Sequence, residues 1–126
     1  MDRFLRRVAF LVFLGLWSFV GSANAQTCRA DAPRYSLQDD VVRWSIAIVS
    51  GRSCTRGVRF KDVQFGSLKL VSPPRFGRVQ LAGSGFVYSS KADFDGQDEF
   101  SLIVVGAVQG TPGNSTIHVT VFIRRY

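Results

Sequence analysis

Residues 86–105, FVYSSKADFDGQDEFSLIVV, contain two alternating apolar segments joined by a short acidic turn. Phe86 and Tyr88 lie two positions apart, and Phe100 resumes the same alternation downstream. A period of two is typical of half-buried strands. Between the segments, Gly96 can adopt positive φ, and the neighbouring carboxylates can accept hydrogen bonds from backbone N–H groups. The stretch therefore predicts two strands separated by a locally stabilised turn.

The pattern F-x-Y at 86–88, then F-x-G-x-D-x-F at 94–100 and a valine-rich strand, resembles the immunoglobulin-like, cadherin-like repeat modules of exported bacterial envelope and surface proteins. Residues 67–81, SLKLVSPPRFGRVQL, resemble the two strands and proline-containing link that precede it in that family, and residues 116–123 resemble its last strand. The resemblance covers about the C-terminal half of the chain. It implies an immunoglobulin-like antiparallel β-sandwich.

The N-terminus has the three parts of a secretory signal peptide: a basic head, an apolar run over residues 8–20, and a small-residue end at Ala23-Asn24-Ala25. The apolar run is shorter than the ~20 residues that span a bilayer as a helix. We therefore expect cleavage of residues 1–25, although an uncleaved membrane anchor is the alternative. The product would be exported to the periplasm or the cell exterior, with no stable membrane anchor.

Residues 26–126 carry 13 basic and 8 acidic side chains, a net charge of +5. Their length suits one β-sandwich domain of about 100 residues. Cys28 and Cys54 both lie in this part of the chain, and exported thiol pairs usually oxidise, which predicts a structural disulfide. A redox-active pair is the alternative, but the two cysteines lack Cys-x-x-Cys spacing.

Alternating apolar residues and Gly, Pro and Asp turns predict about seven strands. Apart from the two strands of the opening stretch, we expect strands at 41–49, 58–65, 67–71, 77–81 and 116–123. The strands at 77–81 and 85–88 should pair across residues 82–84, and residues 112–114 should form the turn before the last strand. We expect this last strand at an edge of a sheet, with His118 on its solvent face.

One face of each predicted strand is apolar and should form the core. The predicted core residues are Trp44, Ile46, Ile48, Leu68, Leu70, Val79, Phe86, Tyr88, Phe100, Leu102, Val104, Val119 and Val121.

The densest basic segment of the predicted mature chain is residues 52–61. It contains Arg52, Arg56, Arg59 and Lys61, and the disulfide should bring Arg29 beside it. Such a loop attracts anionic partners, which in an envelope are acidic polymers or proteins. A solvated loop that only aids solubility is the alternative. Nucleic acid is not an expected partner, because no nucleic-acid-binding signature accompanies the charge.

Asp93, Asp95 and Asp98, with Glu99, form the only cluster of carboxylates. Calcium prefers several converging oxygen ligands, so these residues are a candidate calcium site. The spacing does not fit an EF-hand loop, and Gly96 and Asp98 are more simply explained as residues of a structural turn. No cofactor other than calcium is expected.

Two functions follow from the sequence. The first is a small exported immunoglobulin-like binding or structural module, non-catalytic, that contacts an anionic envelope component or a protein partner through its basic loop. The alternative is a calcium-dependent adhesion or assembly subunit that uses Asp93 to Glu99. An enzyme is not expected, because the chain has one histidine and no set of side chains typical of a catalytic triad or zinc site.

Overall fold

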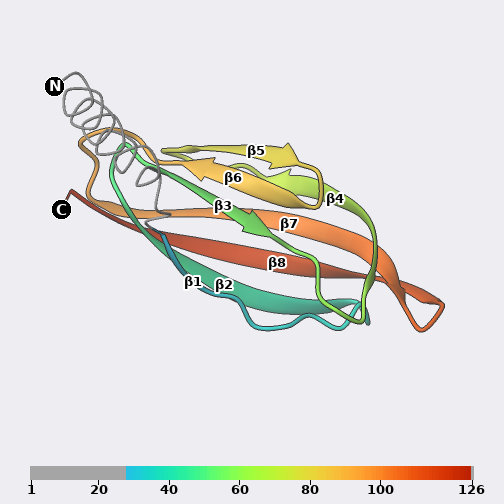
Figure 1. Cartoon of the computed structure of the whole chain (residues 1–126). Coiled ribbons are helices and arrows are strands. Elements are labelled where there is room, and N and C mark those ends of the chain that lie inside the picture. The colour runs from blue at the N-terminus through green and yellow to red at the C-terminus, as the bar shows by residue number, and fades with distance from the viewer. Residues whose placement is uncertain (1–27, 126) are drawn as a thin grey trace, which may run out of the picture.

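The computed structural model describes residues 28–125, and the predicted signal peptide, residues 1–25, lies outside this range. The described residues form eight strands and no helix. The strands are β1 (Arg29–Asp31), β2 (Asp40–Val49), β3 (Ser53–Gly57), β4 (Gln64–Ser72), β5 (Arg78–Ala82), β6 (Gly85–Ser89), β7 (Gly96–Val108) and β8 (Thr111–Arg124). They build a five-stranded sheet, β1-β2-β8-β7-β4, and a three-stranded sheet, β3-β6-β5 (Figure 1). The predicted all-β sandwich is confirmed.

The five-stranded sheet has a parallel pair at its centre, formed by β2 and β8. Trp44 on β2 lies opposite Val119 on β8, and Val119 also lies opposite Phe100 on the antiparallel neighbour β7. The last strand is therefore central, and the prediction of an edge position was wrong. The β2–β8 pair is parallel, whereas every other strand pair of the described residues is antiparallel. Alternation in residues 116–123 indicates which side chains face the core, but it does not identify the flanking strands.

Two tight hairpins connect neighbouring strands. The predicted β5–β6 hairpin is confirmed, with Ala82 opposite Gly85. The turn between β7 and β8, however, lies at Gln109 and Gly110, not at residues 112–114. Both turn residues have positive φ, 51° and 80°, the combination that matches a two-residue turn to the twist of the strands. Residues 112–114 belong to β8.

The strand predicted at residues 58–65 was also wrong, as was the loop predicted over residues 52–61. The short strand β3 occupies part of that loop, and residues 58–63 connect it to β4. Val58 and Val63 are buried without belonging to a strand, because this connection packs its apolar side chains against the core. Apolar residues alternate with polar ones in this connection as they would in a half-buried strand, so the sequence pattern does not distinguish the two.

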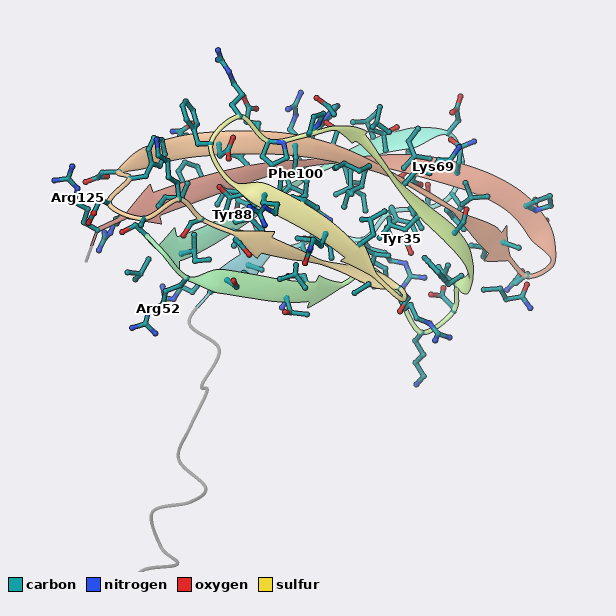
Figure 2. The ribbon with its side chains drawn as sticks, turned by 90° about the horizontal axis from the view of Figure 1, so that it is seen from above. Tyr35, Arg52, Lys69, Tyr88, Phe100 and Arg125 are labelled. Atoms are coloured by element: carbon teal, nitrogen blue, oxygen red, sulfur yellow. A yellow bond between two sulfur atoms is a disulfide. The ribbon has the colours of Figure 1, made fainter. Side chains whose placement is uncertain are left out.

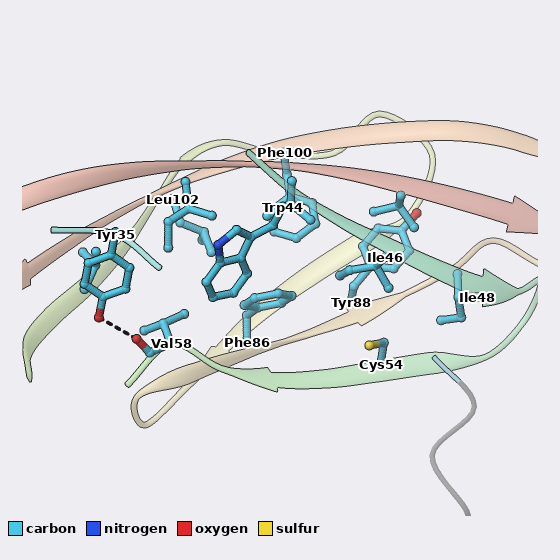
Figure 3. Packing of buried hydrophobic residues seen from close by; sticks show 14 of the residues in the cluster. Tyr35, Trp44, Ile46, Ile48, Cys54, Val58, Phe86, Tyr88, Phe100 and Leu102 are labelled. Carbon is cyan, nitrogen blue, oxygen red and sulfur yellow. Dashed lines mark hydrogen bonds between the residues drawn. The ribbon is translucent and has the colours of Figure 1, made fainter. Parts of the chain in front are cut away.

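The core fills the space between the two sheets (Figure 3). Phe86 of β6 packs edge-on against Phe100 of β7, with 5.2 Å between ring centroids, and Tyr88 stacks on the same ring at 5.8 Å. Ten of the thirteen predicted core residues are buried, and Leu68, Leu70 and Val79 are partly buried against them. The buried apolar residues that were not predicted are Tyr35, Leu37, Cys54, Val58, Val63, Ile117 and Ile123.

The segment between β1 and β2 covers one end of the core. Tyr35 and Leu37 are buried there, and the Trp44 indole Nε1 donates a 2.8 Å hydrogen bond to the Pro33 carbonyl. Leu37 has a positive φ of 58°, and its backbone N–H donates to the Ser115 hydroxyl at 2.9 Å. A left-handed backbone conformation is uncommon for leucine. Burial of the Leu37 side chain and this hydrogen bond offset the cost of that conformation.

The predicted disulfide joins the two sheets. Cys28 immediately precedes β1 of the five-stranded sheet, and Cys54 lies on β3 of the three-stranded sheet, with 5.6 Å between their Cα atoms. The Cys54 side chain is fully buried. The bond therefore fastens the first strand to the opposite layer of the sandwich, and it fits an oxidising, non-cytoplasmic environment.

Candidate functional site

Asp98 is a buried carboxylate at the centre of a hydrogen-bond network. It lies on β7 with 2% of its surface exposed. Its Oδ1 accepts from the backbone N–H of Arg75 at 2.8 Å, and its Oδ2 accepts from Phe76 at 3.2 Å and Gly77 at 2.8 Å. The Tyr88 hydroxyl donates to Oδ2 at 2.8 Å. One side chain thus fixes the β4–β5 connection, residues 73–77, to both sheets.

The same contacts determine the ionisation states of Asp98 and Tyr88. Burial alone would raise the pKa of Asp98, but the hydrogen bonds from the amides of residues 75–77 and from the Tyr88 hydroxyl lower it below its usual value. Burial and the neighbouring Asp98 carboxylate raise the pKa of Tyr88. Asp98 is therefore a charged acceptor at neutral pH, and Tyr88 is a neutral donor.

The structure separates the carboxylates that were predicted as a candidate calcium site. Asp98 points into the sandwich, whereas Asp93 and Asp95 are exposed in the β6–β7 connection. No group of three or more His, Cys, Asp or Glu side chains within residues 28–125 is placed to hold a metal ion. Asp93 and Gly96 both have positive φ, 58° and 159°, so the path of the chain through this connection depends on the backbone at these two positions.

The five cations predicted to form a basic surface, the four of the loop and Arg29, are also divided. Arg52 lies in the turn between β2 and β3, whereas Arg59 and Lys61 follow the other end of β3. A strand of five residues separates them by roughly 16 Å, at 3.3 Å per residue. Arg29 lies on β1, opposite Ala47 of β2. Arg52 therefore lies apart from Arg59 and Lys61, and the cations of the loop do not form one surface.

Arg56, the fifth residue, is half-buried on the inner face of β3. It shares that face with Cys54 and lies opposite the buried Phe86 of β6. Its Nε atom is buried and has no hydrogen-bond partner among the described residues. Arg56 is thus directed toward the interior and is unsuited to contact a large partner.

A different set of cations meets at one end of the sandwich. We call this surface the basic end; it consists of Arg52, Arg75, Arg78, Lys91, Arg124 and Arg125, all exposed. Figure 2 shows Arg52 and Arg125 together at this end, with Lys69 far from both. The exposed carboxylates Asp93 and Asp95 lie in the same region, and Glu99, also exposed, lies on β7 three residues beyond Gly96.

Backbone hydrogen bonds bring three of the contributing segments together. The Ser50 N–H donates to the Arg124 carbonyl at 2.8 Å, which ties the β2–β3 turn to the end of β8. The Ser90 N–H donates to the Arg52 carbonyl at 2.9 Å, and the Ser90 hydroxyl donates to the same oxygen at 3.0 Å. Ser90 precedes Lys91, so this bond places the β6–β7 connection beside the turn. The Asp98 network adds the connection that carries Arg75.

Two phenylalanines accompany these cations. Phe76, in the connection held by Asp98, has 43% of its surface exposed, and its ring stacks on that of Phe94 with 4.6 Å between centroids and 25° between planes. The Arg75 guanidinium carbon lies 5.9 Å from the centroid of Phe76. The region therefore combines positive charge with an exposed aromatic ring on a fixed backbone.

His118 lies on the outer face of the five-stranded sheet. Its Nδ1 is 2.6 Å from the Ser101 hydroxyl on the neighbouring strand β7, and the histidine is half-buried on a central strand. His118 was predicted on the solvent face of an edge strand. It does lie on the outer face of its sheet, but its strand, β8, is central. No carboxylate within the described residues hydrogen-bonds to this imidazole, so the pair is a cross-strand contact rather than two members of a triad.

No protein-family model matches the sequence, and no curated protein shows significant similarity to it. Residues 28–125 contain no helix of the length and apolar character needed to cross a membrane.

Proposed function

We propose that this protein is an exported, non-catalytic binding module of the bacterial immunoglobulin-like kind, which contacts an anionic component of the cell envelope through its basic end. The observation that carries the proposal is the convergence of six exposed cations from separate segments on one end of a disulfide-linked sandwich. The predicted N-terminal signal peptide and the disulfide support export, to the periplasm or the cell exterior.

The positions of these cations favour a large partner with repeated negative charge. They extend across the β2–β3 turn, the β6–β7 connection, the β4–β5 connection and the C-terminal residues. Charges spread in this way steer and hold a polyanion or an acidic protein surface, and the attraction weakens as salt screens it. By contrast, the cations at the opposite end include Arg34, which is already paired with Asp62.

Retention of residues 26–126 on immobilised acidic polymer, measured against salt concentration, tests this function. The triple variant Arg52→Ala, Arg124→Ala, Arg125→Ala should bind at least about tenfold more weakly at low salt. The matched control Arg59→Ala, Lys61→Ala, Lys69→Ala removes the same charge elsewhere and should lose much less affinity. Equal losses in the two variants would show that net charge, not the basic end, causes retention. No retention of the wild type at low salt would overturn the proposal.

A further inference from the structure

The exposed Phe76 is presented by an unusually constrained connection. Three successive backbone N–H groups, from Arg75 to Gly77, donate to the one buried carboxylate of Asp98. A Cβ atom at Gly77 would overlap the Tyr88 hydroxyl and lie 2.6 Å from the Ser89 carbonyl oxygen, so this backbone passes too close to β6 for any other residue. The link is fixed before any partner arrives, which lowers the entropy lost on binding.

Phe76 remains in solvent although its backbone is fixed. Its ring stacks on that of Phe94, and the residue as a whole has 43% of its surface exposed. The adjacent cation Arg75 lies within 6 Å of the ring, and Arg78 is exposed two positions beyond Phe76. Aromatic residues and arginine are enriched at the centre of interfaces, where a few side chains carry most of the binding energy.

From this arrangement we propose that Phe76 and Arg75 form a subsite for one sugar unit of an acidic polysaccharide. The apolar face of a pyranose ring packs on the Phe76 ring, whose negative π face attracts the C–H groups, while the carboxylate of that sugar pairs with Arg75. The remaining cations of the basic end contact the following units of the polymer. This inference rests on the proposed function and narrows its ligand to a polymer that carries rings as well as charge.

Three polymers of similar charge separate the ligand classes: polygalacturonate has acidic sugar rings, polyglutamate is an acidic peptide, and polyphosphate has charge without rings or peptide groups. Calorimetry at low salt should show that Phe76→Ala weakens binding to polygalacturonate by about tenfold or more and binding to the other two by less than about twofold, because only polygalacturonate has a sugar ring to pack on the Phe76 ring. Phe76→Tyr should retain the affinity, and Phe76→Leu should lose it.

Phe122 provides a matched control, since it is exposed to nearly the same extent, 42%, on the outer face of the five-stranded sheet. Phe122→Ala should leave all three affinities unchanged, and melting curves should show that each variant is folded. Unchanged binding of Phe76→Ala to polygalacturonate would overturn the sugar subsite while the basic end still bound polyanions. An equal loss toward polyglutamate would instead identify an acidic protein as the partner. Failure of wild-type protein to bind any of the three would remove the proposed function itself.

Discussion

The Tyr88 hydroxyl donates a 2.8 Å hydrogen bond to Oδ2 of Asp98, which links β6 of the three-stranded sheet to β7 of the five-stranded sheet. Because Asp98 also accepts three amide hydrogen bonds from residues 75–77, the two layers and the β4–β5 connection depend on one carboxylate. Its role is structural, and it indirectly positions the candidate ligand contacts on the neighbouring loop.

Replacing Asp98 with asparagine should destabilise the domain by about 2 to 4 kcal/mol, because one oxygen acceptor becomes an NH₂ donor facing buried donors. Urea unfolding of the two proteins measures the difference. Asp95→Asn changes the same chemistry at an exposed neighbouring position and should alter stability by less than about 0.5 kcal/mol. Similar effects of the two substitutions would contradict the central role of Asp98.

Acid should destabilise the protein through Asp40 as well as Asp98. Burial alone would raise the pKa of Asp40, but hydrogen bonds from the Ser115 hydroxyl and the amides of Ser36 and Gln38 lower it to about 2. A carboxyl whose pKa is lower in the folded than in the unfolded state stabilises the fold above the unfolded value, near 4, and this stabilisation is lost as pH falls through the folded value.

The melting temperature should therefore be nearly constant from pH 7 to 5 and should fall between about pH 4 and 2. Asp40→Asn should have a lower melting temperature at neutral pH and a smaller fall on acidification. If the variant loses as much stability in acid as the wild type, Asp40 is not one of the responsible groups.

Reduction of the Cys28–Cys54 bond should lower stability by up to about 3.5 kcal/mol, the chain-entropy value for a closed loop of this length. Thermal melting with and without a reductant gives the difference, and Cys28→Ala with Cys54→Ala should match the reduced protein. Because β1 has only three residues paired with β2, its amide protons should lose protection from hydrogen exchange first. Unchanged melting on reduction would indicate that β1 is held by other contacts.

Calcium discriminates the proposed module from the alternative calcium-dependent adhesion or assembly subunit. Asp98 is buried with its carboxylate oxygens committed to protein donors, whereas Asp93 and Asp95 are exposed, so millimolar calcium should leave the melting temperature unchanged. A ligand that binds only the folded state raises stability in proportion to RT ln(1 + [L]/Kd). A clear rise with calcium, abolished by Asp93→Ala and Asp95→Ala, would favour the alternative.

Local patterns predicted the strands of this fold better than its loops. The alternation at Trp44, Ile46 and Ile48 identified an inner face of β2, and the glycine between residues 82 and 84 identified a hairpin, because both signals depend only on neighbouring residues. Tyr35 and Leu37 were missed because they are buried outside strands, where no period marks them. The turn at Gln109 was missed because glutamine rarely adopts positive φ.

The candidate site was predicted less well, since it depends on contacts between distant parts of the chain. A cluster of arginines in residues 52–61 is conspicuous in the sequence, yet β3 divides it and directs Arg56 inward. The basic end has no local signature, because Arg52 and Arg124 meet only through the β2–β8 pairing. Asp98 was interpreted as a residue of the acidic turn, whereas it lies on β7 and accepts hydrogen bonds from the connection 73–77.

The central position of β8 also constrains how the chain reaches its native state. Asp40 pairs with Ser115 and Val49 with Arg124, so the partner of β2 lies about 75 residues downstream. Until those residues have left the ribosome or a translocation channel, β2 and β7 have no strand between them. Pairing β2 with β8 also closes a long loop, and the entropy lost in closing it slows folding. Assembly of the larger sheet must therefore wait until β8 has emerged, and a holding chaperone would be most useful just before that moment.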